Sequence, residues 1–263
     1  MWWMTTAALA ATPFERTIDA PARSVDVEVI CGALRIVGRP GPGVHVSGTL
    51  DTPDLLDVGA SRIAVSRKAK RDACVDLTIE VPADTALDVT SISARLDVSG
   101  VTGPLELESV SGAVSVVGSP SRVELATVSG GVSLEGAMPV LEVDTVSGAI
   151  TVVTTAPMTA VELGAVSGAI SLAGPLAPQG RLEASTHSGA ITARLPADLD
   201  ARVELATLSG RVHNAFGDRE IVLRSGAGSV ELATFSGGLT LEQLPAAPLS
   251  SDAPQPAPDA APE

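Results

Sequence analysis

The sequence predicts an all-β protein, a single-chain β-solenoid (β-helix) with coils of about 18–21 residues and two short strands per repeat copy. A segment of about twelve residues recurs along the chain, with the same residue types at equivalent positions (columns) of each copy. The apolar residues of each copy alternate with period two, as they do in strands. One copy cannot bury its own apolar face, whereas copies stacked about 4.8 Å apart can. A β-sandwich is the alternative, but sandwiches do not repeat with such column fidelity.

The recurring line is clearest in VELATVSGGVSL (123–134), LEVDTVSGAITV (141–152) and VELGAVSGAISL (161–172). Seven copies share a Ser-Gly pair, which we assign to a structural corner, and a glutamate stands six residues before each glycine. The pairs are Ser111-Gly112, Ser129-Gly130, Ser147-Gly148, Ser167-Gly168, Ser188-Gly189, Ser209-Gly210 and Ser236-Gly237; the acids are Glu106, Glu124, Glu142, Glu162, Glu183, Glu204 and Glu231. Degenerate copies at 87–98 and 25–36 add Asp88 and Asp26, so nine carboxylates are predicted along one face.

Each copy is predicted to turn a corner between its two strands. In the copy around Gly130, Leu125 points inward before the corner and Val132 after it, but the parity slips between Leu125 and Val128. Because such a slip turns the other face inward unless the chain bends, we place the corner near Thr127 and Val128, with Val128 in the core. The glycine then lies beside the corner on the inward parity, where a side chain would crowd the core.

The flanking segments set the domain organisation. Residues 1–11 are apolar and contain the pattern Ala8-Leu9-Ala10, so we interpret them as a signal-peptide remnant, with a frayed terminus as the alternative. Residues 12–86 are predicted to form an N-terminal β cap that includes the first repeat copy, and residues 87–242 the β-solenoid repeats. Residues 243–263, rich in Pro and Ala, are predicted to be a disordered tail.

Two regions interrupt the repeat. Residues 38–86 carry strand-like runs without the full register, and we expect capping hairpins there; their basic turn, 67–72, holds the only lysines, Lys68 and Lys70. Residues 214–229 form an insertion in the last copy, with an extra strand at 220–223 and the Gly-rich turn SGAGS. Such a turn can hold phosphate, but no lysine or helix signal follows it, so a plain loop is favoured.

Composition excludes some functions. The formal net charge is −14, whereas binding to nucleic acid needs a basic surface, so we expect no nucleic-acid partner. The apolar start is shorter than the roughly 20 residues that span a bilayer, and no other segment qualifies, so no transmembrane segment is predicted.

The repeated lines also resemble a known family. The recurring TVSGAI lines, the late LSGRVHNAFG and the closing SGAGSVELATFSGGLTL are similar to the bacterial putative-adhesin family of β-strand repeats, a domain of unknown function. The resemblance covers roughly residues 17–242. It implies a β-helix that is secreted or attached to the cell envelope.

We therefore expect a non-enzymatic, exported scaffold, adhesion or binding module, periplasmic or extracellular, with an envelope or surface partner that could be cationic. The alternative is a carbohydrate-active β-helix enzyme, a lyase or hydrolase, which needs paired carboxylates in a sugar-shaped groove, usually with aromatic platforms. The only aromatic residues after the apolar start are Phe14, Phe216 and Phe235, and His187 falls in an inward apolar column. We assign no catalytic residue, cofactor site or metal site.

The cysteines and the small outward residues suggest structural roles. Cys31 and Cys74 are both predicted to point outward, and export would permit a disulfide, with two unpaired thiols as an equal alternative. Outward hydroxyl residues three positions after most glycines are interpreted as allowing close stacking, with a contact surface or an ice-binding face as alternatives; they are Ser115, Ser133, Thr151, Ser171, Thr192 and Thr240.

The acid column is the nearest feature to a functional site. Arg122, Arg181 and Arg202 stand two residues before glutamates on the same strand face and compensate part of the column. The central stretch, which we expect to be less compensated, is predicted to attract Ca²⁺ or basic envelope peptides weakly; it comprises Glu142, Asp144 and Glu162. A solvated charged edge that discourages lateral aggregation is the alternative.

Overall fold

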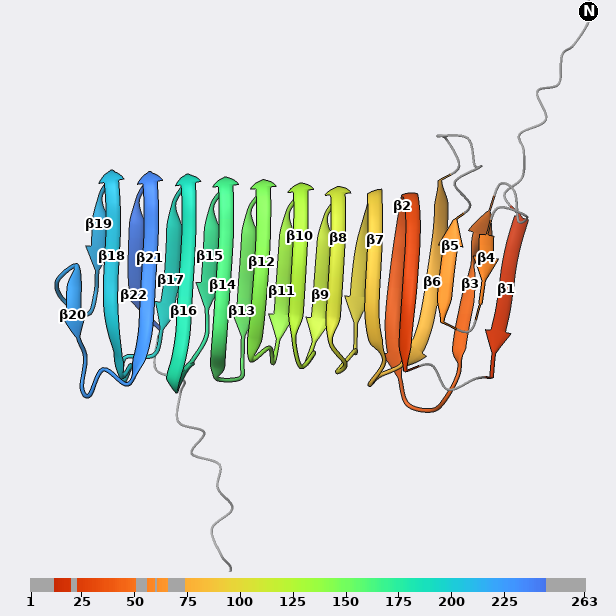
Figure 1. The fold of residues 1–263 in the computed structure, drawn as a ribbon, viewed down its shortest axis with the longest axis horizontal. Coiled ribbons are helices and arrows are strands. Elements are labelled where there is room, and N and C mark those ends of the chain that lie inside the picture. The colour runs from red at the N-terminus through yellow and green to blue at the C-terminus, as the bar shows by residue number, and fades with distance from the viewer. Residues whose placement is uncertain (1–11, 20–22, 51–55, 60, 66–73, 245–263) are drawn as a thin grey trace, which may run out of the picture.

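The computed structural model describes residues 12–19, 23–50, 56–59, 61–65 and 74–244 (Figure 1). The apolar start, the basic turn at 67–72 and residues 245–263 of the predicted tail lie outside this part of the chain. The described chain is all β, and its strands stack side by side along one long axis. The predicted all-β solenoid fold is therefore confirmed.

Each regular coil contributes one strand to a front layer and one to a back layer (Figure 1). Neighbouring coils pair in parallel and in register, so that Glu124 lies between Glu106 and Glu142. The front strands are β8 (Leu105–Ser111), β10 (Val123–Ser129), β12 (Val140–Ser147), β14 (Met158–Ser167) and β16 (Leu176–Ser188). The back strands are β9 (Val114–Gly118), β11 (Val132–Gly136), β13 (Ile150–Thr154), β15 (Ile170–Ala173) and β17 (Ile191–Leu195).

The core lies between the two layers and is filled by their inward aliphatic side chains. In β10 and β11, Leu125 and Val132 are buried, as the alternation predicts. The predicted place of the corner is wrong, however, because Thr127 is only 5% exposed whereas Val128 is 49% exposed. The inward parity thus continues through Thr127, and Val128, which the sequence pattern placed in the core, lies on the outer surface.

The inward residue before the corner is polar in most coils, and in several of them its hydroxyl donates to a carbonyl of the turning backbone. Thr186 and Thr234 donate to the carbonyls of Gly168 and Gly189, at 3.4 and 3.3 Å. Ser109 donates to the carbonyl of Ser111 at 3.3 Å. Because an unpaired buried hydroxyl is costly, these bonds explain why a hydroxyl is tolerated inside the solenoid in these coils. The Thr145 hydroxyl of β12 is the exception, because it is buried without a hydrogen-bond partner among the described residues.

The glycine of each Ser-Gly pair is required by its neighbouring coil. A Cβ added at Gly130 would overlap the carbonyl oxygen of Gly112, and one added at Gly148 would overlap that of Gly130. The same relation joins Gly168 to Gly148. The crowding therefore comes from the backbone of the adjacent coil and not, as predicted, from the core.

The C-terminal end does not stack in chain order. The coil of β21 (Gly228–Ser236) and β22 (Leu239–Gln243) lies between the coil of β16 and β17 and the earlier coil of β18 (Ala201–Ser209) and β19 (Val212–Asn214) (Figure 1). Strand β20 (Glu220–Val222) pairs antiparallel with the outer edge of β18. Residues 214–229 therefore carry the chain around the outermost coil and back into the stack, and they do not interrupt a single last copy.

One carboxylate holds the loop that leads back into the stack. Asp200 accepts hydrogen bonds from the amides of Ser225, Gly226 and Ala227 at 2.8–3.3 Å, and from the Ser225 hydroxyl at 2.7 Å. The Ser225 hydroxyl is the main cause, and the amides further causes, of a pKa of Asp200 below its usual value. Arg224 enters this loop in the left-handed region, at φ 55°.

The N-terminal end is also out of chain order. Strands β2 (Ser24–Arg39) and β7 (Ala86–Ser99) run through the corner without a break and pair in parallel, with Asp26 beside Asp88. On its other side β2 pairs with β5 (Arg62–Val65) and β6 (Val75–Pro82), which carry the register one coil further out. Residues 38–86 thus contain a broken coil as well as the expected hairpins.

Antiparallel strands close this end. Strand β1 (Thr12–Ile18) pairs with β3 (Val44–Leu50), β3 pairs with β6, and β4 (Leu56–Val58) pairs with β5. These strands cover the edges that parallel stacking would otherwise leave open to another chain.

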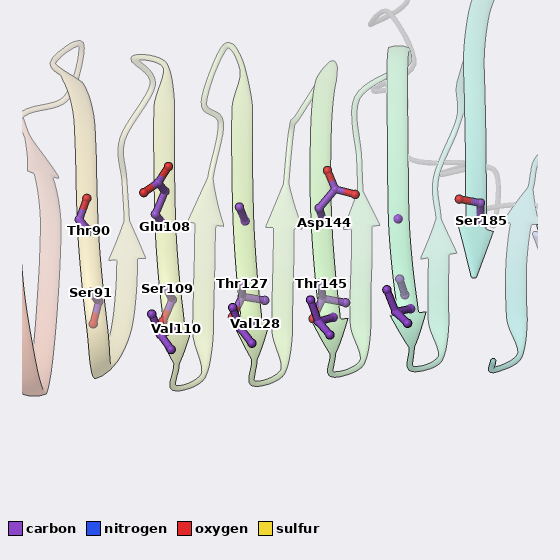
Figure 2. A pocket seen from close by; sticks show the side chains of 15 residues that line it. Thr90, Ser91, Glu108, Ser109, Val110, Thr127, Val128, Asp144, Thr145 and Ser185 are labelled. Atoms are coloured by element: carbon purple, nitrogen blue, oxygen red, sulfur yellow. The ribbon is translucent and has the colours of Figure 1, made fainter. Parts of the chain in front are cut away.

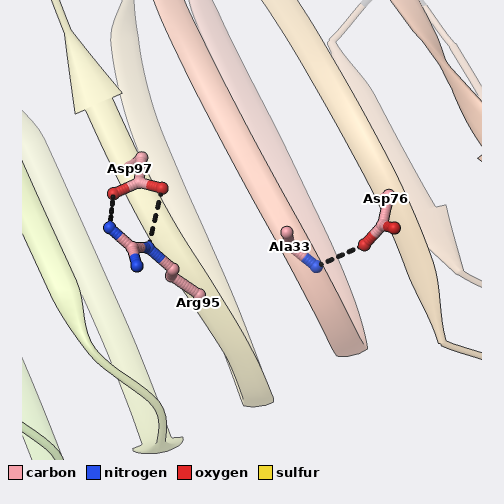
Figure 3. Close-up of polar contacts among 4 residues, drawn as sticks. All are labelled: Ala33, Asp76, Arg95 and Asp97. Carbon is pink, nitrogen blue, oxygen red and sulfur yellow. Dashed lines mark hydrogen bonds and ion pairs between the residues drawn. The ribbon is translucent and has the colours of Figure 1, made fainter.

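A disulfide and local polar contacts fix the N-terminal corner. Cys31 in β2 is bonded to Cys74, just before β6, with the two Cα atoms 4.5 Å apart. Cys74 is exposed, but Cys31 is only 8% exposed, so the outward position predicted for Cys31 is covered. Nearby, the amide of Ala33 donates to Asp76 at 3.0 Å, drawn with a neighbouring arginine–aspartate pair in Figure 3.

Candidate binding groove

The outer face of the front layer carries three columns of side chains that run along the solenoid axis, and we call them the acid, middle and apolar columns. The acid column is in register from strand to strand, which places nine carboxylates on one face. In spatial order its members are Asp26, Asp88, Glu106, Glu124, Glu142, Glu162, Glu183, Glu231 and Glu204.

Arginines pair with part of this acid column. Arg122 bonds to both Glu124 and Glu142, at 3.2 and 2.9 Å, and Arg181 bonds to Glu183 at 2.6 Å. The expectation that Glu142 is less compensated than the other acids is therefore wrong, because the side chain of Arg122 reaches one coil beyond its own.

The first member of the column, Asp26, is compensated from the N-terminal cap. Arg62 stands at the acid position of the outermost coil and bonds to Glu28 at 2.7 Å and to Asp26 at 3.7 Å. Partial burial, and then the neighbouring carboxylates of Asp26, Glu108 and Glu28, raise the pKa of Asp88. Negative charge is therefore dense around Asp88, which has no arginine partner among the described residues.

The middle column, two residues after each acid, is mostly small. Ala126, Gly164 and Ser185 hold this position in β10, β14 and β16, whereas Glu108 and Asp144 hold it in β8 and β12. The Asp144 carboxylate reaches over Gly164, where an added Cβ would overlap its Oδ1. In β8 to β16, two carboxylates therefore project from a surface of otherwise small side chains.

The apolar column comes directly before the serine of each corner. Its members in β7, β8, β10, β12 and β14 are each 49–54% exposed: Ile92, Val110, Val128, Val146 and Val166. His187 continues the column in β16 and is exposed, so its predicted place in the core is wrong. Its ring stacks on that of Phe235 in β21, with centroids 4.8 Å apart, and Leu208 in β18 completes the column at 74% exposed.

A groove of about 640 Å³ runs between the middle and apolar columns across β7 to β16. Figure 2 shows Val110 and Val128 along one side, near the strand ends, and Glu108 and Asp144 along the other. The groove exists because Ala126 and Gly164 are too small to fill the space between the two columns.

The two carboxylates of the groove are unlike those of the acid column. Within the part of the chain that the structure describes, neither Glu108 nor Asp144 forms an ion pair or a side-chain hydrogen bond, and both are exposed. The groove therefore combines an apolar wall with uncompensated negative charge, which is the complement of a cationic amphiphile.

Among residues 12–19, 23–50, 56–59, 61–65 and 74–244, no group of three or more His, Cys, Asp or Glu side chains is arranged to hold a metal ion. In these ranges there is also no helix of the length and apolarity that crossing a membrane requires.

The fold and this surface define the class of the protein, a capped β-solenoid with a grooved acidic face. The chain belongs to the Toastrack DUF4097 family, whose model matches residues 57–202, from β4 to the start of β18. The family resemblance found in the sequence is thereby confirmed.

Solved structures of low sequence identity are similar to this chain. A putative adhesin from Bacteroides fragilis is 13% identical over 89% of this chain and 97% of its own, with a TM-score of 0.41. A putative lipid binding protein from Parabacteroides distasonis is 10% identical over 90% and 98%, with a TM-score of 0.38. A putative adhesin from Parabacteroides merdae is 13% identical over 90% and 98%, with a TM-score of 0.29. No curated protein matches the sequence.

The apolar wall is the part of the groove that sequence reasoning missed. The signal was present, because an aliphatic residue, His or Phe precedes the corner serine, or Cys31 in the first copy, in every aligned copy. It was assigned to the core because an apolar column beside a corner was taken to be inward. The predicted cation-binding residues are divided by the structure: Asp144 lies in the groove, whereas Glu142 and Glu162 lie in the acid column.

Proposed function

We propose that the protein is a non-enzymatic, exported binding module of the cell envelope that takes a cationic amphipathic ligand in the groove of its front layer. The observation that carries the proposal is the apolar column, in which five consecutive coils each expose one aliphatic side chain beside a groove. A monomeric protein rarely keeps so continuous an apolar surface in water unless a partner covers it.

Charge selects the kind of ligand. Glu108 and Asp144 face the groove without a cation, and the acid column behind them, with Asp144 flanked by Glu142 and Glu162, adds to the negative potential. An anionic amphiphile would meet repulsion from these carboxylates, and a neutral one would leave them uncompensated. A ligand with one apolar edge and one cationic edge satisfies both sides.

An enzyme is less well supported. Glu108 and Asp144 stand two coils apart on the same side of the groove, and the opposite wall is aliphatic, so no pair of carboxyl groups flanks a position for a sugar. The stacked pair of His187 and Phe235 lies on β16 and β21, beyond the valine wall of the groove.

Calorimetric titration tests the proposal with three probes that share a decyl chain: an alkylammonium, an alkyl sulfonate and an alcohol, each below its aggregation concentration. We expect the alkylammonium to bind most tightly, and we expect its affinity to fall as the salt concentration rises. In Val128→Ser/Val146→Ser its binding should fall about tenfold, because two half-exposed valines are lost.

The back layer supplies the matched control. Val117 and Val153 in β9 and β13 are 49% and 45% exposed, so Val117→Ser/Val153→Ser removes the same chemistry from the opposite face. Equal binding of all three probes would refute the selection for cationic ligands. Equal loss in the two double variants would show that the groove is not the binding site. Turnover of acidic polysaccharides by the protein would favour the enzyme instead.

A further inference from the structure

We infer that the natural ligand of the groove is a basic amphipathic α-helix that lies along the solenoid axis. The inference rests on the proposed function and adds the conformation and chemical class of the ligand. Three features of the groove support it: the hydrogen-bond pairing of its strands, the spacing of its apolar wall and the spacing of its carboxylates.

The backbone of the groove has no capacity left for an extended peptide. Strand β10 is paired on both sides, with β8 and β12, and β12 is paired with β10 and β14. A peptide laid across these strands meets side chains only, so an extended peptide gains no backbone hydrogen bonds from the sheet. A helix satisfies its backbone internally and needs only side-chain contacts.

The spacing of the apolar wall is closer to that of a helix stripe than to that of an extended peptide. Neighbouring coils are about 4.8 Å apart, so Val110 to Val166 spans about 14 Å in three steps. Four apolar residues on one helix stripe, three or four positions apart, span about 16 Å, whereas four residues on one face of an extended peptide span about 20 Å. The helix therefore matches the wall more closely.

The free carboxylates agree with the same geometry. Glu108 and Asp144 belong to coils two steps apart, which gives about 10 Å between their positions. Two lysines seven residues apart on a helix are separated by about 10.5 Å along its axis and lie on nearly the same side. One face of such a helix can therefore place leucines on the valines and lysines on both carboxylates.

Two synthetic peptides of identical leucine and lysine content test the inference. Each has about 16 residues, the length of helix that spans the groove from β7 to β16. One spaces its leucines three and four apart, and the other alternates leucine and lysine. We expect the first to bind at least about tenfold more tightly and to gain helical circular dichroism on binding, because a free helix of this length is marginal.

The groove variants give the specificity of that binding. Val128→Ser/Val146→Ser and Glu108→Gln/Asp144→Asn should each weaken the helical peptide about tenfold, whereas Val117→Ser/Val153→Ser should leave it unchanged. Tighter binding of the alternating peptide, binding without a gain in helicity, or equal affinity in all variants would overturn the inference.

The outcomes also separate this inference from the proposed function. Binding of decylammonium but of neither peptide leaves the proposed function standing and refutes the helix; binding of none of them refutes both. A last experiment measures binding of the protein to vesicles of phosphatidylcholine that contain a cationic lipid. Vesicle binding that is lost in the same groove variants, together with weak peptide binding, would make the groove a membrane-facing surface and refute the helix.

Discussion

The middle of the solenoid and its two ends are built in different ways. In the middle, from β8 to β17, coils follow one another in chain order and every coil closes its corner with a glycine that fits against the neighbouring coil. At the ends, coils are placed out of chain order, antiparallel strands cover the edges, and a disulfide and a carboxylate-bound loop hold the chain. The repeat thus specifies how coils stack, and separate devices specify where stacking stops.

The largest expected effect lies at the N-terminal end. Replacing both cysteines, as in Cys31→Ala/Cys74→Ala, opens a link between residues 43 positions apart and should lower the free energy of unfolding by about 4 kcal/mol in the chain-entropy model. Because only one end is clamped, we expect hydrogen exchange to accelerate in β5 and β6 while β12 to β15 keep their protection.

The same protein with its disulfide chemically reduced serves as the control, since it should reproduce the exchange pattern of the double variant. Acceleration that is uniform over the whole stack would contradict a difference between the end and the middle.

A smaller effect is expected from the middle itself. In Gly148→Ala the new Cβ overlaps the carbonyl oxygen of Gly130, so neighbouring coils must move apart, at a cost of about 1 to 3 kcal/mol. The matched control is Gly131→Ala, because a Cβ there meets nothing within 4 Å and should change stability by less than about 0.5 kcal/mol. Denaturant melts measure both variants, and equal values would show that the glycine column is not required.

The smallest effect concerns the C-terminal end and is local. The hydrogen bonds to Asp200 lower its pKa, so its contribution to stability is present above the unfolded value of 3.8 and is lost as the pH falls through the lower folded value. We expect the amides of Ser225 to Ala227 to lose exchange protection in Asp200→Ala at neutral pH.

In the wild-type protein the same amides should lose protection on acidification below about pH 4. Asp198 lies two residues earlier and its side chain is exposed, so Asp198→Ala is the control for the loss of one negative charge alone. Protection that is identical in both variants would show that Asp200 does not hold the loop.

The regular part of the fold was predictable because its columns repeat. The register of the acids and the Ser-Gly pairs in the sequence reappears as strand pairing, with Ser129 between Ser111 and Ser147. The fold could be read from these columns because burial alternates with period two and because stacking brings like residues side by side.

The corner and the ends could not be predicted in the same way. Thr127 looked like an outward residue since its hydroxyl is polar, yet its bonding partner is a carbonyl that only the folded corner supplies. That misplacement hid the apolar wall, because it turned Val128 inward. The repeat pattern does not determine the spatial order of the terminal coils, because all coils carry matching residues and each could pack between any two others.

The position of β21 and β22 affects when the C-terminal end can fold during synthesis or secretion. Strand β18 joins the stack through β21, which is synthesised later. If the chain is translated or secreted from its N-terminus, β18 and β19 emerge before the strands that attach them, and the last coil must enter a gap one strand wide. The nascent protein therefore completes its C-terminal end only after residue 243 has left the ribosome or the translocation channel. A chain released early would carry two unpaired strand edges, which quality-control proteases and chaperones recognise.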